Sequence, residues 1–286
     1  MLKYDESNHA LYIAHLTVTA NGQLLGGGVS VLDVCQPSSQ PGELDEPIVQ
    51  FAGLSRKTFL PETLSQAVAQ LSPGTSSPTA GAPVIWATAR YSAAISAMTF
   101  RNLPLAACDA TRARDLTLIA GEHFLSPAFL PNGSDVRGIL FSSDGKRAYV
   151  LHRNDSDATA NPAALAVLDR SRMLADGTPS NEPIAVLQVC NGPSAMQMKN
   201  LGRGDRIFVT CYDDGQIYVI DPVALQVVGS VDAGAGPVSL VFVGDTGLAY
   251  VASFANSHLS FIDFKPGSPT ENRVRLRIGL PHGYGE

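Results

Sequence analysis

The sequence predicts an all-β fold built from a repeated unit of four short strands. Residues 86–100 and 250–264 align without a gap, and each reads as an aromatic-led apolar run, a short polar turn and a second apolar run ending in Phe. Segments 148–169 and 207–221 follow the same plan. Self-similar units of about 40–50 residues made of short strands are typical of blade arrays. We therefore expect a single β-propeller over 1–286 with about five visible four-stranded antiparallel blades.

The two clearest units cover 191–232 and 233–280. Gly192-Pro193 opens the first and Gly236-Pro237 opens the second. Asp214-Gly215 predicts a tight hairpin, because this dipeptide accepts the positive φ that two-residue turns require. The apolar runs of these units predict strands at 194–199, 207–212, 216–220, 225–231, 239–243, 248–254, 259–264 and 273–278.

The remaining units are less regular and cover 1–53, 54–125 and 126–190. The third carries the turn Ser143-Asp144-Gly145 and a polar insert at 153–163. In the second, the 61–71 portion predicts a short helix with Pro61 at its start. The short run at 2–4 and the new opening at 279–281 indicate an incomplete ring, an unusual five-bladed ring or a fragment of a larger propeller. We favour the fragment, because a closed ring hides its sheet edges.

The composition excludes several classes of protein. The chain is 45% apolar and 16% charged, so global disorder is excluded. Its net charge is −6, and its one basic cluster, Arg273, Arg275 and Arg277, alternates with apolar residues as an outer strand does. We therefore expect no nucleic-acid partner. The sequence contains no apolar run of 18 residues, so we also expect no transmembrane segment.

The third unit has a recognisable motif. Residues 141–150 read Phe-Ser-Ser-Asp-Gly-Lys-Arg-Ala-Tyr-Val, and 219–222 read Val-Ile-Asp-Pro. This pattern resembles the YVTN-type β-propeller repeat, closely over 135–280 and more loosely over 9–125, where Thr99 replaces the expected Asp. The resemblance implies an extracytoplasmic bacterial protein, whether periplasmic, secreted or surface-anchored. The first residues show no signal-peptide core, which taken alone indicates a cytoplasmic location.

Recurrent aspartates and glycines are interpreted as turn residues. An Asp that closes a strand before a turn caps its own backbone, so a carboxylate ring is the less favoured interpretation. The residues assigned to this structural motif are Asp33, Asp144, Gly145, Asp169, Asp214, Gly215, Asp221 and Asp263.

Four cysteines, Cys35, Cys108, Cys190 and Cys211, show neither C-x-x-C nor zinc spacing. Neighbouring blades can place Cys190 beside Cys211, which permits a disulfide. Two buried free thiols are the alternative.

Two histidines share a pattern. His15 and His152 each follow a Tyr by three residues in corresponding strands, so both can point to one rim. Imidazoles at a propeller mouth can bind metal or transfer protons, but a metal site normally needs three or four ligands. Asp135 and Arg137 are the nearest further candidates for a catalytic set.

The functional hypothesis is a noncatalytic binding or scaffolding propeller of the bacterial cell envelope. Its expected contact loops are 36–47, 54–80, 153–163 and 265–272, and its partner is a protein or a small molecule. The alternative is a lactonase-like hydrolase, because a related propeller family opens sugar lactones, and this alternative requires a divalent metal or an acid/base pair. No other cofactor is predicted, and a haem protein is disfavoured because the sequence lacks C-x-x-C-H.

Overall fold

The computed structural model describes strands in five separate sheets, and it contains no helix among its described residues. The described residues are 2–5, 9–20, 23–34, 49–53, 64–70, 84–90, 95–100, 107, 114, 116, 118–125, 135–153, 163–172, 175, 180 and 182–279. Within them, no helical segment has the length and hydropathy needed to cross a membrane.

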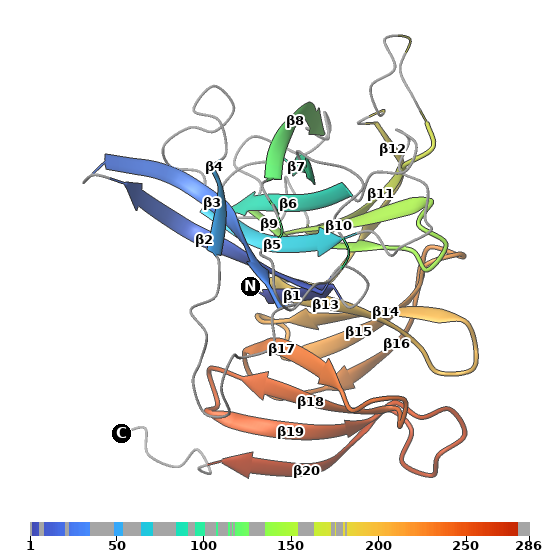
Figure 1. Cartoon of the computed structure of the whole chain (residues 1–286). Coiled ribbons are helices and arrows are strands. Elements are labelled where there is room, and N and C mark those ends of the chain that lie inside the picture. Colours follow the sequence, from blue (N-terminus) through green and yellow to red (C-terminus); the bar gives the residue numbers. More distant parts are fainter. Residues whose placement is uncertain are drawn as a thin grey trace. The chain divides into compact units, whose positions relative to one another are not determined.

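Each sheet has four strands, and in all five the strands lie side by side in sequence order (Figure 1). The first sheet is β1 (Leu2–Asp5), β2 (Ala10–Ala20), β3 (Gln23–Asp33) and β4 (Val49–Gly53), and the second is β5 (Leu64–Gln70), β6 (Val84–Arg90), β7 (Ile95–Phe100) and β8 (Leu118–Leu125). The third is β9 (Asp135–Phe141), β10 (Arg147–Arg153), β11 (Ala164–Asp169) and β12 (Pro183–Gln188). The fourth is β13 (Pro193–Asn200), β14 (Asp205–Cys211), β15 (Gln216–Asp221) and β16 (Gln226–Asp232), and the fifth is β17 (Pro237–Phe242), β18 (Leu248–Ser253), β19 (His258–Asp263) and β20 (Arg273–Gly279). Each sheet lies inside one of the five predicted repeat units.

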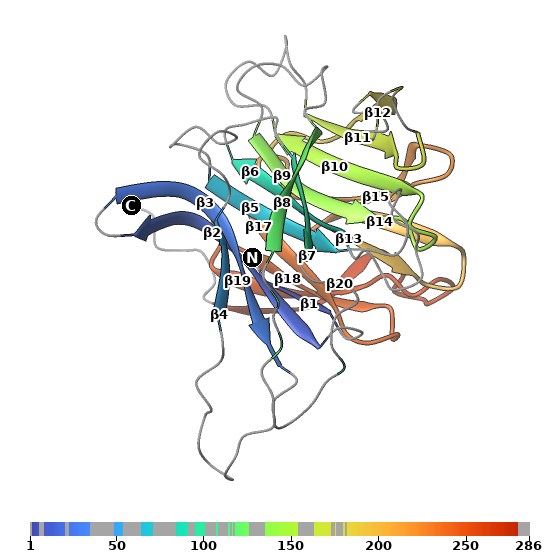
Figure 2. The same ribbon diagram turned by 45° about the horizontal axis from the view of Figure 1, so that its top comes forward.

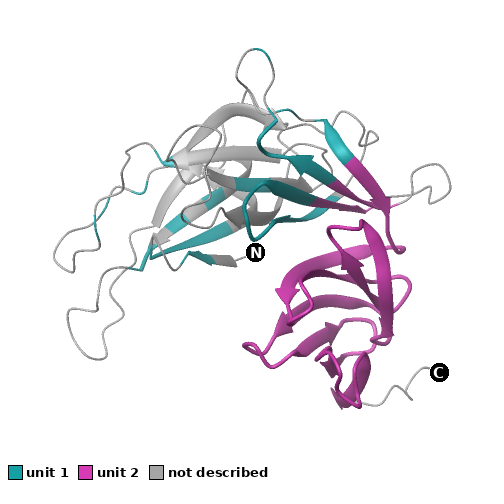
Figure 3. Ribbon diagram, turned by 90° about the vertical axis from the view of Figure 1, so that its right-hand side faces the viewer, with its two compact units in different colours: residues 1–149, 167–184 teal, residues 150–166, 185–286 magenta. Residues whose placement is uncertain are grey.

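The chain divides into two compact units, which Figure 3 colours separately. One contains residues 1–149 and 167–184, and the other contains 150–166 and 185–286. The sheet β9–β12 contributes residues to both units.

The first unit has an aromatic core. Tyr12 and Phe100 are buried with their ring centroids 6.3 Å apart, and Trp86 meets Phe141 edge to face at 5.2 Å. Its β2 and β3 form a hairpin of 11-residue strands (Figure 2). Burial of apolar side chains explains why β10 and β11 become strands: five successive residues of each are buried, so both faces of their sheet are covered there.

The predicted helix at 61–71 is wrong, because residues 64–70 form β5 and pair with β6. Leu, Ala and Gln are good helix formers, but intrinsic propensity is a weak prior that tertiary context overrides. Here the partner strand satisfies the backbone hydrogen bonds that a helix would have made internally.

In the second unit, the sheets β13–β16 and β17–β20 share one apolar core. It contains Phe208, Ile217, Val219 and Val231 from the first sheet, together with Leu240, Ala249, Val251 and Ile262 from the second. The two Asp-Gly pairs lie in turns between consecutive strands, one between β9 and β10 and the other between β14 and β15. Gly145 and Gly215 both adopt a φ of 69°, in the left-handed region that glycine reaches without strain.

Candidate functional site

Of the predicted histidine pair, His152 is the member whose side chain is described. His152 is a buried residue of β10, and burial lowers its pKa because the charged imidazolium is poorly solvated there. The side chains of His15 and Asp135 lie outside the described set. Arg137 is half-buried on β9.

No group of three potential metal ligands occurs among the described His, Cys, Asp and Glu residues. His152 therefore has no set of metal-ligating neighbours in this portion of the protein. A neutral, buried imidazole on a strand is a packing residue unless a ligand reaches it.

The recurrent aspartates accept hydrogen bonds from the turns that follow them. Asp169 Oδ1 accepts the amide of Ser171 at 2.9 Å, Asp221 Oδ1 accepts the amides of Val223 and Ala224 at 2.9 Å, and Asp263 Oδ1 accepts that of Lys265 at 2.9 Å. Asp144 Oδ1 accepts the Ser142 hydroxyl at 2.6 Å within its own turn. These contacts give the carboxylates a structural role.

Hydrogen bonds to the carboxylate favour its charged form and lower its pKa. The hydroxyl of Ser171 does this for Asp169, and the Ala224 amide, with the Val223 amide and Arg206, does it for Asp221. Both groups therefore stay ionised at neutral pH, which suits turn capping and does not suit a general acid.

Three aspartates of the turn motif make contacts beyond their own turns. Asp221 Oδ2 lies 3.3 Å from Arg206 Nη1 on β14. Asp33 forms a buried ion pair with Arg114, with Nη2 to Oδ1 at 2.6 Å and Nε to Oδ2 at 3.0 Å. Asp214 accepts both the backbone amide and the Nδ2 of Asn191, each at 3.0 Å. The ion pair joins residues 81 positions apart, so no local sequence pattern indicates it.

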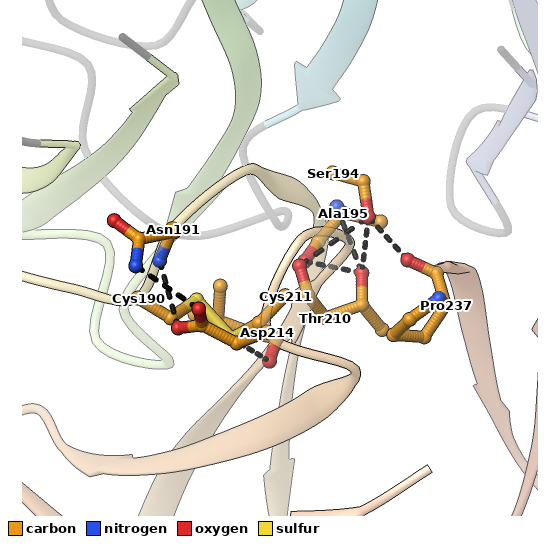
Figure 4. Close-up of a disulfide and its surroundings, with 9 residues drawn as sticks. Cys190, Asn191, Ser194, Ala195, Thr210, Cys211, Asp214 and Pro237 are labelled. Carbon is orange, nitrogen blue, oxygen red and sulfur yellow. Dashed lines mark hydrogen bonds between the residues drawn. A yellow bond between two sulfur atoms is a disulfide. The ribbon is translucent and has the colours of Figure 1, made fainter. Parts of the chain in front are cut away.

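Cys190 and Cys211 are joined by a disulfide (Figure 4), and both residues are buried. The bond connects the segment before β13 to the last residue of β14, with the two Cα atoms 5.8 Å apart. Asn191 and Asp214 lie beside it in the same view. Cys35 and Cys108 lie outside the described residues.

Arg170 is a buried cation that sequence reasoning did not single out. Its Cζ atom lies 4.5 Å from the Phe141 ring centroid and 5.2 Å from that of Trp86, and its Nη1 donates to the Gly145 carbonyl at 2.5 Å. Burial lowers its pKa to about 10, so it remains charged at neutral pH. Cation–π contacts in a desolvated site compensate for lost hydration. Arg170 therefore anchors the Asp144-Gly145 turn to the aromatic core.

One rim of the second unit carries large side chains at corresponding positions. Arg153, Tyr212 and Phe254 each stand four residues after an aromatic residue of the second strand in their sheets. The amides of Tyr212 and Phe254 donate to the carbonyls of Gly192 and Gly236 at 2.8 and 2.7 Å, which confirms that these two positions are equivalent.

The rim combines charge with aromatic surface. Arg153 Nη2 lies 3.3 Å from Asp213 Oδ2, and its guanidinium sits 5.8 Å from the Tyr212 ring centroid. Gly192 makes room for this arrangement, because a Cβ there would lie 2.1 Å from Asp213 Oδ2. Phe254 is 72% exposed. The ion pair beside Tyr212 and the exposed ring of Phe254 occupy corresponding turns of different sheets, and together they offer a polar group and an apolar surface to a ligand.

A shallow hollow of about 680 Å³ adjoins Phe254. It is lined mainly by apolar residues of β17–β20, including Val238, Ala252, Leu259 and Ile278, with His258 at one side. His258 Nε2 lies 3.1 Å from the Ala233 carbonyl, so the bond fixes the ring with Nε2 as its donor.

Among the predicted contact loops, 265–272 is described throughout. It connects β19 to β20, whereas Phe254 begins the turn between β18 and β19 at the other end of the same strands. Residues 64–70 of the predicted loop 54–80 form strand β5 instead, because they pair with β6. Segments 36–47 and 54–63, as well as 71–80 and 154–162, lie outside the described residues.

No family model matches the sequence, and no curated protein matches it. Solved structures do resemble it. The periplasmic gluconolactonase of Pseudomonas aeruginosa superposes with a TM-score of 0.57 at 16% identity, over 98% of this chain and 70% of that one. A chain of the mitotic checkpoint complex gives 0.56 at 15% identity, over 98% and 64%. A chain of a nidogen/laminin complex gives 0.54 at 11% identity, over 98% and 79%.

These likenesses show the fold and nothing finer, because identity is low throughout. The protein is an all-β chain of four-stranded antiparallel sheets with the architecture of a β-propeller, as the repeats predict. The chain spans about two thirds of the length of two of these structures.

Proposed function

We propose that the protein is a noncatalytic binding propeller that uses the rim formed by Arg153, Tyr212 and Phe254. The observation that carries the proposal is the 72% exposure of Phe254 beside a hollow of about 680 Å³. Large exposed aromatic residues next to concave apolar surface are typical of contact sites for ligands or proteins. The partner is a protein or a small molecule with an apolar face and a polar group that reaches Arg153.

We also propose an extracytoplasmic location in the bacterial cell envelope. A buried structural disulfide, Cys190–Cys211, supports this location, because such bonds form and persist in oxidising compartments. The similarity to a periplasmic propeller is consistent with it. The Asp-Gly turns and strand-closing aspartates support assignment of the repeats to the YVTN type.

The lactonase-like alternative has less support from the geometry. It requires His152 to meet a metal or an acid/base partner at an accessible mouth, and His152 is 3% exposed within β10. The similarity to a gluconolactonase supports the shared fold alone.

Capture from an envelope extract of the source organism, quantified by mass spectrometry, tests the binding proposal. The variant Arg153→Ala/Phe254→Ala is compared with the unaltered protein and with Val223→Ala. Val223 is a suitable control because it is exposed in the turn between β15 and β16, at the opposite sheet end from the rim. A panel of small metabolites, read by thermal shift on the same three proteins, covers a small-molecule partner.

We expect at least one binder to be retained by the unaltered and control proteins and reduced tenfold or more by the rim variant. Equal capture by all three proteins, with no differential thermal shift, contradicts the proposal. Hydrolysis of gluconolactone by the purified protein that disappears in His152→Ala favours the hydrolase instead.

A further inference from the structure

The sheets β13–β16 and β17–β20 have the same register, which allows their faces to be compared residue by residue. In β17–β20, one face presents two rows that cross all four strands, and we call this surface the open face. Its rows are Val241, Tyr250, Phe261 and Leu276, and Ser239, Ala252, Leu259 and Ile278. The corresponding rows of β13–β16 are Gln197, Phe208, Val219 and Gly229, and Ala195, Thr210, Ile217 and Val231.

Corresponding positions differ sharply in burial. Phe208 is 2% exposed, whereas Tyr250 at the same register position is 37% exposed. Val231 is 4% exposed, whereas Ile278 is 54% exposed. The open face therefore leaves in solvent the apolar rows that the preceding sheet buries. Contiguous exposed apolar surface of this kind marks an interaction site in soluble proteins.

The preceding sheet shows what such a face accepts. Its rows pack against the opposite face of β17–β20, which we call the back face and which includes Leu240, Phe242 and Val251. The Phe208 ring lies 4.8 Å from both Phe242 and Phe264, each edge to face. In the one case that the described residues show, a face with these rows therefore packs against the apolar back face of another four-stranded sheet.

The hollow beside Phe254 forms the rim end of the open face. Val238 and Ala252 line it, where the preceding sheet has Ser194 and Thr210. In that sheet, Ser194 donates to the carbonyl of Pro237 at 2.6 Å and so bonds to the sheet that covers it. The open face has apolar side chains at these positions. Because this end is the hollow assigned above to a ligand, the sheet contact proposed below rests on the row of Val241, Tyr250, Phe261 and Leu276, farther from the rim.

The first sheet, β1–β4, has the residue types of a back face at the register positions that matter. Aromatic, aliphatic and serine residues recur there in the same order as in β17–β20. The corresponding positions are Leu2 and Leu240, Tyr4 and Phe242, Ile13 and Val251, Ser30 and Ser260, Leu32 and Ile262, and Val49 and Val274. Tyr4 is 51% exposed, and Leu11 and Ile13 are half-buried.

We propose that the open face binds a second copy of this chain, whose sheet β1–β4 packs on it as β17–β20 packs on β13–β16. The contact joins two different surfaces, so it is head to tail. Such a contact either closes into a ring or continues as a chain of subunits. It buries Tyr250 and Leu276 of one copy against the Tyr4 position of the other.

Mass measured by light scattering on the intact chain tests this proposal. The open-face variant is Leu276→Glu, the back-face variant is Tyr4→Glu, and Ile184→Glu on β12 is the matched control because Ile184 is also an exposed apolar residue on a strand. Circular dichroism verifies that each variant is folded. None of these substitutions touches the rim residues used to test binding.

We expect the unaltered and control proteins to form oligomers whose mass rises with concentration, and each face variant to be a monomer. An equimolar mixture of the two face variants is the decisive sample, because one interface remains intact between them. It should give a complex with twice the mass of the chain and no larger species. A monomeric unaltered protein at about 100 μM, well above typical subunit dissociation constants, overturns the proposal. It is also overturned if the mixture remains monomeric or if Tyr4→Glu has no effect.

Discussion

Sheets β13–β16 and β17–β20 solve the same structural problem in two ways. In each, the segment that enters the sheet must be attached to the end of the second strand. Sheet β13–β16 uses the disulfide between Cys190 and Cys211. Sheet β17–β20 has Gly234 and Ser253 at the corresponding positions. Gly234 stands two residues before the Gly-Pro pair, and Ser253 stands three residues after the aromatic residue of the second strand.

The second sheet replaces the covalent bond with a hydrogen-bonded carbonyl. The Ala233 carbonyl lies 3.2 Å from Ser253 Oγ, 3.1 Å from His258 Nε2 and 3.5 Å from Ser260 Oγ. Gly234 allows this arrangement, because its missing side chain leaves room for the His258 ring. The comparison shows that the entering segment can be attached to the end of the second strand either by a disulfide or by a small network of hydrogen bonds.

The largest expected effect comes from breaking the covalent closure. Cys190→Ala/Cys211→Ala should lower the free energy of unfolding by about 3 kcal/mol, because the bond closes a loop of about 20 residues in the unfolded chain. Urea unfolding of the oxidised protein and the variant measures this difference. Reducing agent should lower the stability of the unaltered protein by more than it lowers that of the variant. A loss below about 1 kcal/mol would mean that the disulfide is dispensable.

A side chain at position 234 should disrupt the hydrogen bonds that the Ala233 carbonyl accepts. Gly234→Ala places a Cβ 2.6 Å from His258 Cε1 at a φ of +84°, so we expect a loss of about 2 kcal/mol from strain and displacement of the ring. Gly202→Ala is the control, because its φ is +89° and a Cβ there meets nothing within 4 Å. The control should cost about 1 kcal/mol from backbone strain alone. Equal losses would show that His258 moves aside freely.

Removing one donor from the carbonyl is a milder test of the same network. Ser253→Ala should cost about 1 kcal/mol, because Ser253 is buried and its hydroxyl donates to Ala233. Ser239→Ala, an exposed serine of the open face, should change stability by less than about 0.5 kcal/mol. If both variants are equally stable, the hydroxyl of Ser253 does not contribute to the closure.

The smallest effect concerns His152 of sheet β9–β12, which occupies the position equivalent to Cys211 in β13–β16 and to Ser253 in β17–β20. Its folded-state pKa lies below the ordinary 6.5, so the unfolded chain binds the proton more readily. Stability should therefore fall as pH drops below about 6.5 and should be independent of this group at higher pH. Urea unfolding measured at several pH values in that range should show that the free energy of unfolding falls more steeply with decreasing pH in the unaltered protein than in His152→Leu. Parallel slopes would contradict the buried, neutral state of His152.

Much of the fold follows from local signals in the sequence. Gly192-Pro193, Gly236-Pro237 and the Asp-Gly turns mark where strands begin and end, because these residues have strict backbone requirements. The helix prediction at 61–71 failed because Leu, Ala and Gln do not reveal the strand β6 that pairs with them.

The site was less accessible to sequence reasoning. The Arg170 contacts with Trp86 and Phe141, and the Asp33–Arg114 ion pair, join residues that are far apart in the sequence. The histidine pattern was visible, but burial of His152 was not. The open face could not be found either, because its apolar residues have the same types and spacing as those that the preceding sheet buries.

Site-directed crosslinking tests most directly the claim that the open face of β17–β20 packs on sheet β1–β4 of a second copy. In the buried interface Phe208 contacts Phe242, and the corresponding positions on the open face and on β1–β4 are Tyr250 and Tyr4. The single variants Tyr250→Cys and Tyr4→Cys are mixed and oxidised gently, then analysed by non-reducing gel and peptide mass spectrometry. The account predicts a disulfide-linked pair of chains that joins these two positions and that neither variant forms alone. Absence of this pair from the mixture would contradict the account.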